Sequence, residues 1–176
     1  MMINTDQIRL VLFDVDGVLT DGSLFIGSDG EICKPFNARD GVAVALLKKH
    51  KIMVGVISGK ASKALDYRIR QLNFDFSITG CNDKLNALDK IMKSSSFNPS
   101  QIAFVGDDIV DMPIMKKVVL GIAPSDAHQL VIDCADHITK SKGGDGVARE
   151  TAEFILSNTG LSLSEMYTGL VDDITQ

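Results

Sequence analysis

Short apolar runs alternate with longer segments of helical period along most of the chain. Each run has the length of a buried strand, and the segment after it repeats apolar residues every three or four positions. This alternation predicts an α/β fold: a Rossmann-like, three-layer arrangement with helices on both faces of a parallel sheet. The predicted strands are residues 10–15, 53–57, 76–78, 102–105 and 120–122. The predicted helices are residues 42–50, 62–72, 84–93, 112–118, 127–134 and 147–156.

One segment departs from this alternation. Two short apolar stretches, residues 24–26 and 31–34, flank a Gly-Ser-Asp-Gly turn of hairpin composition at 27–30. We predict a β-hairpin flap over about residues 19–36, inserted after the first strand. No other insertion is long enough to form a cap domain, so residues 1–176 are expected to form one domain.

Charge and cysteine usage narrow the functional classes. A net charge of −5, with no basic stripe, disfavours nucleic acid as a partner, because clustered lysine and arginine hold phosphate backbones. The N-terminal segment has no long apolar stretch, which predicts neither a signal peptide nor a membrane span and favours the cytoplasm. The chain has three widely spaced cysteines, Cys33, Cys81 and Cys134. Because the number is odd and the spacing wide, we expect reduced thiols.

Acidic residues follow two of the predicted strands. Asp14 and Asp16 end the first strand, where positions two apart share a face. An isolated pair of this kind is more often a simple turn, and a calcium loop of the EF-hand type is excluded because its other ligand positions are missing. After the fourth strand come Asp107, Asp108 and Asp111. Helix capping explains one or two of these acids, but not a second cluster at a second strand end.

The two clusters are expected to meet, because ligands of open α/β sheets lie outside the carboxyl ends of the strands. An oxygen-rich site of this kind suits a hard cation such as Mg²⁺, which retains several waters and meets a substrate phosphate.

Two further positions favour phosphate binding. Ser58, Gly59 and Lys60 follow the second strand and offer a hydroxyl and backbone N–H groups at a helix entrance, although the same residues also suit an ordinary cap and turn. Lys84 lies at a predicted helix start, where the helix dipole disfavours a cation. A functional role would explain that placement, while a solvent-exposed lysine is the simpler alternative.

In order along the chain, these residues resemble the four motifs of the haloacid dehalogenase superfamily. The motif residues are 14–22 (DVDGVLTDG), Ser58, Lys84 and 106–111 (GDDIVD). The flap, together with 36–41 (FNARDG) and 142–150 (KGGDGVARE), resembles the uncapped branch of that superfamily. This branch includes phosphatases of 3-deoxy-D-manno-octulosonate 8-phosphate and of nine-carbon sialic-type acids, and a phosphatase-like module fused to some cytidylyltransferases.

The resemblance implies a phosphatase mechanism. Asp14 would attack phosphorus and form an aspartyl phosphate, and Asp16 would serve as general acid and then general base. The resemblance also implies Mg²⁺ as the cofactor. The metal would be held by Asp14, the backbone carbonyl of Asp16 and Asp107, with Asp108 and Asp111 in support, while Ser58, Gly59 and Lys84 would hold the phosphoryl oxygens.

The resemblance to this branch implies that the substrate is a small phosphorylated sugar acid. Its carboxylate would meet Lys60 and Arg39 near the mouth of the site. Members of the branch that act on octulosonate usually carry arginine where this chain has Lys60, and lysine lacks the planar fork that grips a carboxylate. Lys60 facing solvent is the alternative.

Two rival functions remain at this point. A non-catalytic scaffold would not need the complete set of acids and phosphate ligands. A phosphate-transfer enzyme would need water excluded between half-reactions, which the lack of a cap disfavours.

The resemblance and the flap both favour a homo-oligomer, specifically a tetramer. An isolated two-stranded ribbon is marginal in water and needs a surface to pack on. The tail, about residues 160–176, has two alternatives: it reaches the site of an adjacent subunit, or it forms a short amphipathic helix folded back on its own chain.

Overall fold

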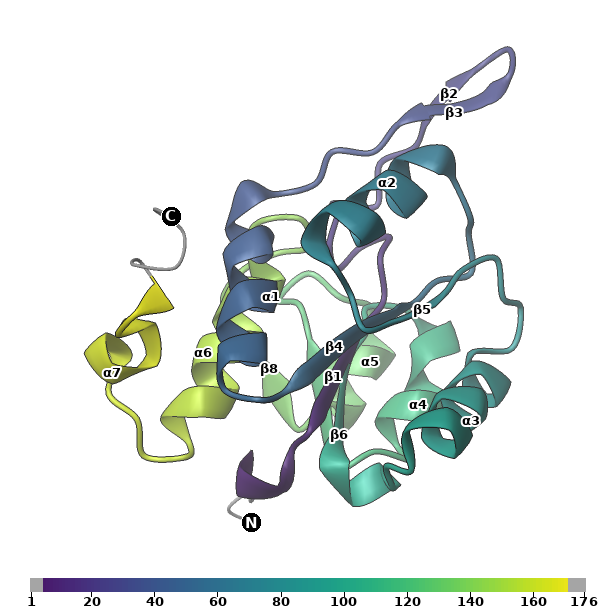
Figure 1. The fold of residues 1–176 in the computed structure, drawn as a ribbon. Helices are drawn as coiled ribbons and strands as arrows, with labels where there is room; N and C mark the ends of the chain where they lie inside the picture. Colours follow the sequence, from purple (N-terminus) through teal and green to yellow (C-terminus); the bar gives the residue numbers. More distant parts are fainter. Residues whose placement is uncertain (1–4, 171–176) are drawn as a thin grey trace.

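The computed structural model describes residues 5–170 and shows a parallel sheet between two layers of helices (Figure 1). Its six strands lie in the order β5-β4-β1-β6-β7-β8, and a separate two-stranded sheet, β2-β3, forms the flap. The main strands are β1 (Leu10–Phe13), β4 (Met53–Ile57), β5 (Phe76–Ile78), β6 (Ile102–Val105), β7 (Leu120–Ala123) and β8 (His137–Ile138). The predicted α/β architecture with an inserted flap is confirmed.

Helices α1, α2 and α6 cover one face of the sheet, and α3, α4 and α5 cover the other (Figure 1). The helices are α1 (Ala38–Lys49), α2 (Lys63–Leu72), α3 (Lys84–Ser95), α4 (Met112–Met115), α5 (Gln129–Cys134), α6 (Val147–Ser157) and α7 (Leu163–Tyr167). Short 3₁₀ turns occupy Thr5–Gln7, Pro99–Gln101 and Ile109–Asp111.

Alternation of side chains in β1 divides the core into two parts. Val11 and Phe13 point into the core beneath α1 and α6, whereas Leu10 and Leu12 point toward α3 and α4. All four are fully buried, as expected for a parallel strand covered on both faces. None of the helices in residues 5–170 is both long and apolar enough to cross a membrane.

Most element boundaries agree with the sequence prediction, and the differences have local causes. The first strand ends at Phe13 rather than at residue 15, because the chain turns out of the sheet there. Helix α1 begins earlier than predicted, since the Asn37 side chain accepts a hydrogen bond from the Arg39 N–H and caps it. Strand β8 was not predicted, because two residues are too few to show a period.

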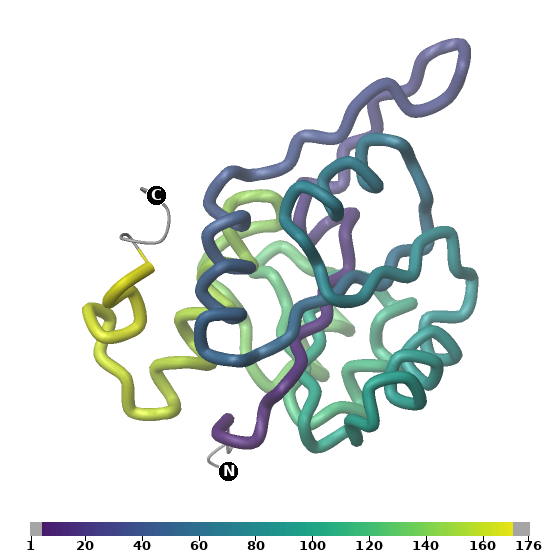
Figure 2. The backbone as a smooth tube through the Cα atoms, viewed as in Figure 1, coloured from purple at the N-terminus to yellow at the C-terminus, as the bar shows by residue number. Residues whose placement is uncertain are grey.

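The flap, β2 (Phe25–Gly27) and β3 (Gly30–Cys33), projects away from the body of the molecule above α2 (Figure 2). Its pairing is antiparallel, with a bulge between Phe25 and Ile26. Ile26 is 63% exposed and Ile32 is 70% exposed, so the flap offers apolar side chains to solvent. Within residues 5–170 it is the only sheet outside the main one.

Candidate active site

The predicted site residues follow three neighbouring strands at the carboxyl edge of the sheet. Asp14 comes directly after β1, Ser58 after β4, and Asp107 two residues after β6. Strand β1 lies between the other two, and the chain leaves it on one side toward β4 and β5 before returning on the other side to β6. The site therefore lies at a topological switch point, where the loops diverge and leave room for a ligand.

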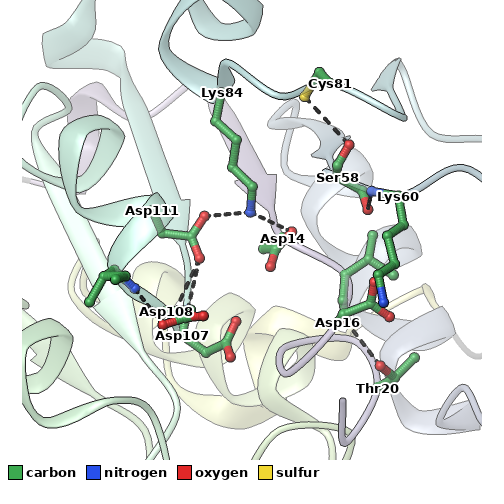
Figure 3. Close-up of polar contacts among 12 residues, drawn as sticks. Asp14, Asp16, Thr20, Ser58, Lys60, Cys81, Lys84, Asp107, Asp108 and Asp111 are labelled. Atoms are coloured by element: carbon green, nitrogen blue, oxygen red, sulfur yellow. Dashed lines mark hydrogen bonds and ion pairs between the residues drawn. The ribbon is translucent and has the colours of Figure 1, made fainter. Parts of the chain in front are cut away.

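Lys84 lies between two of the acids, as Figure 3 shows. Its ammonium group is 2.8 Å from Asp14 Oδ1 and 2.6 Å from Asp111 Oδ1, and its side chain is only 8% exposed. Burial by itself would lower the pKa of Lys84, but the carboxylates of Asp14 and Asp111 reverse this effect and hold the pKa above its usual value. The cation at the start of α3 is therefore stabilised by these two acids, with the side chain of Asp83 capping the helix.

Asp111 anchors the acidic loop after β6. Its Oδ2 accepts hydrogen bonds from the N–H groups of Asp107 (3.2 Å) and Asp108 (3.3 Å), while its Oδ1 meets Lys84. The side chain is fully buried. Because both oxygens already have partners, Asp111 is suited to orienting Lys84 and the Asp107 loop. The Asp108 side chain accepts from the Ile109 N–H and caps the following 3₁₀ turn, so its observed contact is local.

Asp14, Asp107 and Asp111 each offer a carboxylate oxygen within 4.8 Å of the others, which suits a metal ion. Asp107 Oδ1 is buried and has no hydrogen-bond partner among the described residues. Burial, followed by the charges of Asp14 and Asp111, raises the pKa of Asp107 to about 8. Burial and Asp111 raise the pKa of Asp14 to about 6, although Lys84 opposes them. A divalent cation would satisfy the orphan oxygen and offset this repulsion, so the donor set fits such an ion.

Gly17 keeps the approach to Asp107 open. Its φ is +90°, and a Cβ at this position would overlap the Asp107 carboxylate. The first acidic loop can therefore pass close to the second only with glycine here.

Asp16 points away from this cluster and contacts the flap. Lys34, which follows β3, forms an ion pair with its Oδ1. Burial would lower the pKa of Lys34, but hydrogen bonds to Asp16 and Glu31 hold it above its usual value. The contact of Lys34 with Asp16 was not predicted from the sequence, because no local pattern links positions 16 and 34.

The loop after β4 places Ser58 beside the nucleophile candidate. Ser58 is 1% exposed, its N–H donates to Ile78 O (2.9 Å), and its hydroxyl accepts from the Lys60 N–H (3.2 Å). Gly59 is exposed and a Cβ there would meet only ordinary contacts. Burial would raise the pKa of Glu31, but hydrogen bonds to Ser62 and Lys34, followed by the charges of Lys34 and Lys60, lower it.

Arg39 lies elsewhere. Its side chain is 70% exposed, pairs loosely with Asp145 (3.5 Å), and lines an open groove of about 430 Å³ whose lining includes none of the other predicted site residues. Lys60 follows Ser58 in the loop after β4, at the sheet edge that carries the acids, whereas Arg39 belongs to α1 and lies outside this site.

The two segments that carry the branch resemblance, residues 36–41 and 142–150, contact each other and the loop after β1. Asn37 Nδ2 donates to Gly144 O (3.0 Å), and the Gly144 N–H donates to Val18 O (3.0 Å). Asp40 Oδ1 accepts from the N–H groups of Ala148 and Arg149, capping α6 from another helix. Asp40 belongs to the segment 36–41 of the branch resemblance, but its capping role was not predicted, since the contact spans more than a hundred positions.

The described part of the tail folds back on its own chain. Met166 is 2% exposed and packs in the core, and the Tyr167 hydroxyl donates to Glu153 Oε1 (2.6 Å). This is the second of the two alternatives for residues 161–170; residues 171–176 lie outside the described residues.

Comparison with known proteins places this geometry in a family. The model of the haloacid dehalogenase-like hydrolases matches residues 68–150. A 3-deoxy-D-manno-octulosonate 8-phosphate phosphatase of Escherichia coli (strain B / BL21-DE3) is 38% identical over 160 residues, which cover 91% of this chain and 85% of that protein.

Two solved structures are similar throughout. The cobalt-bound form of the corresponding Haemophilus influenzae phosphatase has a TM-score of 0.87 at 36% identity, covering 89% of this chain and 92% of that one. The Moraxella catarrhalis phosphatase, in complex with a magnesium ion, a phosphate ion and a KDO molecule, has a TM-score of 0.86 at 30% identity, covering 98% and 96%.

Proposed function

Because the chain belongs to the haloacid dehalogenase-like hydrolase family and is a phosphoric monoester hydrolase of that family, we propose that its substrate is 3-deoxy-D-manno-octulosonate 8-phosphate. The observation that carries a phosphatase mechanism is the buried bridge from Asp14 through Lys84 to Asp111, beside the orphan oxygen of Asp107. It combines a carboxylate nucleophile, a fixed cation and a site for a divalent metal at one sheet edge.

In the proposed first half-reaction, a carboxylate oxygen of Asp14 forms a bond to phosphorus while the bond from phosphorus to the sugar oxygen breaks. Asp16 gives its proton to the departing oxygen. Lys84, which pairs with Asp14, and Ser58, which follows the neighbouring strand β4, hold phosphoryl oxygens. In the second half-reaction Asp16 takes a proton from water, whose oxygen attacks the aspartyl phosphate and frees Asp14 and inorganic phosphate.

We propose Mg²⁺ as the divalent metal, held by Asp14, Asp107 and the backbone carbonyl of Asp16. Oxygen donors of this kind are those that Mg²⁺ prefers, and the unpartnered Asp107 Oδ1 lies in a carboxylate cluster with Asp14. When bound, the ion would offset negative charge at the transferring phosphoryl group. Activity should stop on chelation with EDTA and return with Mg²⁺; turnover that is indifferent to the chelator would remove the metal from the mechanism.

Phosphate release from purified sugar phosphates tests the mechanism and the substrate together. We expect Asp14→Asn to abolish turnover and to keep its circular dichroism spectrum, since the amide conserves size but is a poor nucleophile. Wild-type turnover by this variant would exclude the covalent route. We expect the octulosonate 8-phosphate to be preferred over nine-carbon acid 9-phosphates and neutral hexose phosphates. Equal efficiency toward neutral sugars would contradict the substrate assignment.

Lys60 is the proposed contact for the sugar carboxylate, because it lies beside Ser58 at the site whereas Arg39 does not. Lys60→Ala should raise KM mainly for acidic sugars, and Arg39→Ala should have a smaller effect. A larger KM change in Arg39→Ala would reverse this assignment.

We also propose that the protein is a homotetramer in which flaps of several subunits pack together. The exposed apolar residues of the flap support this proposal: Leu24, Phe25, Ile26 and Ile32 are each between 46% and 70% exposed. Sedimentation equilibrium should give a tetramer at micromolar concentration. A fully active monomer would contradict the proposal, and a shortened chain that ends at Gly160 tests whether the tail takes part.

A further inference from the structure

Lys34 is the one lysine or arginine of the flap, residues 19–36, and it is buried. It follows β3, and its side chain is only 1% exposed, although Ile32 two residues earlier is 70% exposed. The ammonium group lies between two carboxylates: it forms an ion pair with Asp16 and another with Glu31, at 3.0 Å. A lysine that faced solvent for solubility would not be enclosed in this way.

This arrangement joins three parts of the protein. Asp16 belongs to the loop after β1, Lys34 and Glu31 belong to the flap, and Glu31 also interacts with Ser62, which caps α2. The Glu31 carboxylate is 13% exposed, and the Asp16 carboxylate is 22% exposed. Lys34 therefore forms an ion pair between the flap and Asp16, and a second ion pair, with Glu31, fixes the position of Lys34.

We propose that Lys34 is a positioning residue, which fixes the Asp16 carboxylate in the orientation needed to exchange a proton with the departing sugar oxygen. The inference rests on the proposed function of Asp16 as general acid and base. A short carboxylate next to Gly17 has alternative rotamers, and a buried cation with two anionic partners selects one of them. Misplacing a catalytic group by about 1 Å costs about a hundredfold in rate, so the loss of this pair should appear in catalysis.

The decisive experiment compares two leaving groups in Lys34→Met, a neutral variant of similar length. A sugar alkoxide needs a proton to depart, whereas p-nitrophenolate departs without one, and kcat/KM covers only the steps up to that departure. We expect kcat/KM for the octulosonate phosphate to fall about tenfold to a hundredfold, and that for p-nitrophenyl phosphate to fall less than about threefold. Equal losses on both substrates would overturn the proposal, because a general structural defect affects both alike.

A double-mutant cycle with Asp16→Asn tests whether Lys34 acts through Asp16. In the Asp16→Asn background, Lys34→Met should lower kcat/KM for the sugar phosphate by less than about a further twofold. If the two residues acted independently, the fold-losses of the single variants would multiply. Glu31→Gln should lose less than Lys34→Met, because the pair with Asp16 survives; equal losses would assign the effect to flap anchoring and overturn the proposal. If Lys34→Met does not fold, Lys34→Gln carries the same expectations.

Lys117→Met is the matched control. Lys117 forms a 2.5 Å ion pair with Asp89, away from the acidic cluster, and should keep wild-type kinetics on both substrates. The kinetics of the two variants separate a failure of the proposed acid role of Asp16 from a failure of the proposed positioning role of Lys34. Wild-type kcat/KM in Asp16→Asn on the sugar phosphate would overturn the acid role of Asp16 and this inference with it. A loss in Asp16→Asn with none in Lys34→Met would overturn this inference alone.

Discussion

Replacing Asp107 by asparagine should stabilise the metal-free protein while removing its metal site. Burial and the charges of Asp14 and Asp111 raise the pKa of Asp107 from 3.8 to about 8. The folded protein therefore retains a proton between about pH 4 and pH 8 that the unfolded chain has released. A raised pKa of this kind contributes stability below the unfolded pKa, and that contribution is lost as pH rises through the folded pKa. Asp107→Asn removes this dependence.

The magnitude follows from the size of the shift. One pKa unit corresponds to about 1.4 kcal/mol, so a rise from 3.8 to about 8 sets an upper bound of about 5 kcal/mol near about pH 7.5. The side chain keeps some contact with solvent, which screens the repulsion. We therefore expect Asp107→Asn to be more stable than the wild type by about 2 kcal/mol at about pH 7.5 in EDTA, and by much less near about pH 4.

Urea unfolding followed by circular dichroism is the suitable assay, because the chain has no tryptophan. Mg²⁺ should then stabilise the wild type by mass action and leave Asp107→Asn unchanged. Asp133→Asn is a matched control: Asp133 is exposed and accepts a hydrogen bond from Gln129, which an amide oxygen can also accept. If Asp107→Asn were less stable than the wild type in EDTA at about pH 7.5, the inferred repulsion of Asp107 by Asp14 and Asp111 would be refuted.

Three further changes test the structure. Gly17→Ala should lower kcat at least tenfold and destabilise the protein by about 1–3 kcal/mol, measured by steady-state kinetics and urea unfolding, because its φ is +90° and the added Cβ overlaps Asp107; wild-type kinetics would contradict this. Burial raises the pKa of Asp40 to about 6, so the free energy of unfolding of Asp40→Asn should rise by about 1–2 kcal/mol relative to that of the wild type between about pH 4 and pH 7. Parallel curves of stability against pH for the two proteins would contradict this raised pKa. Tyr167→Phe should lose about 1 kcal/mol of unfolding free energy, because its hydroxyl bonds Glu153, and leave kcat unchanged.

The sequence by itself determined the layer architecture and where chemistry should lie. Apolar runs and helical periods are local properties, so strands β4, β5 and β6 agree residue for residue with their predicted ranges. Because parallel strands end at one edge, acids after β1 and β6 are brought together by any sheet in which these strands are neighbours. Beyond that strand order, the placement of Asp14 and Asp107 beside each other required no further information.

The tertiary structure decided the partners of these residues. Lys84 contacts Asp111 across 27 positions, Lys34 contacts Asp16 across 18, and Asp40 caps a helix 108 positions away. No periodicity records such pairs, because each depends on the path of the loops between its members. The separation of Lys60 from Arg39 has the same origin, because only the folded chain shows that Lys60 lies beside Ser58 at the sheet edge of the acids while Arg39 lines another groove.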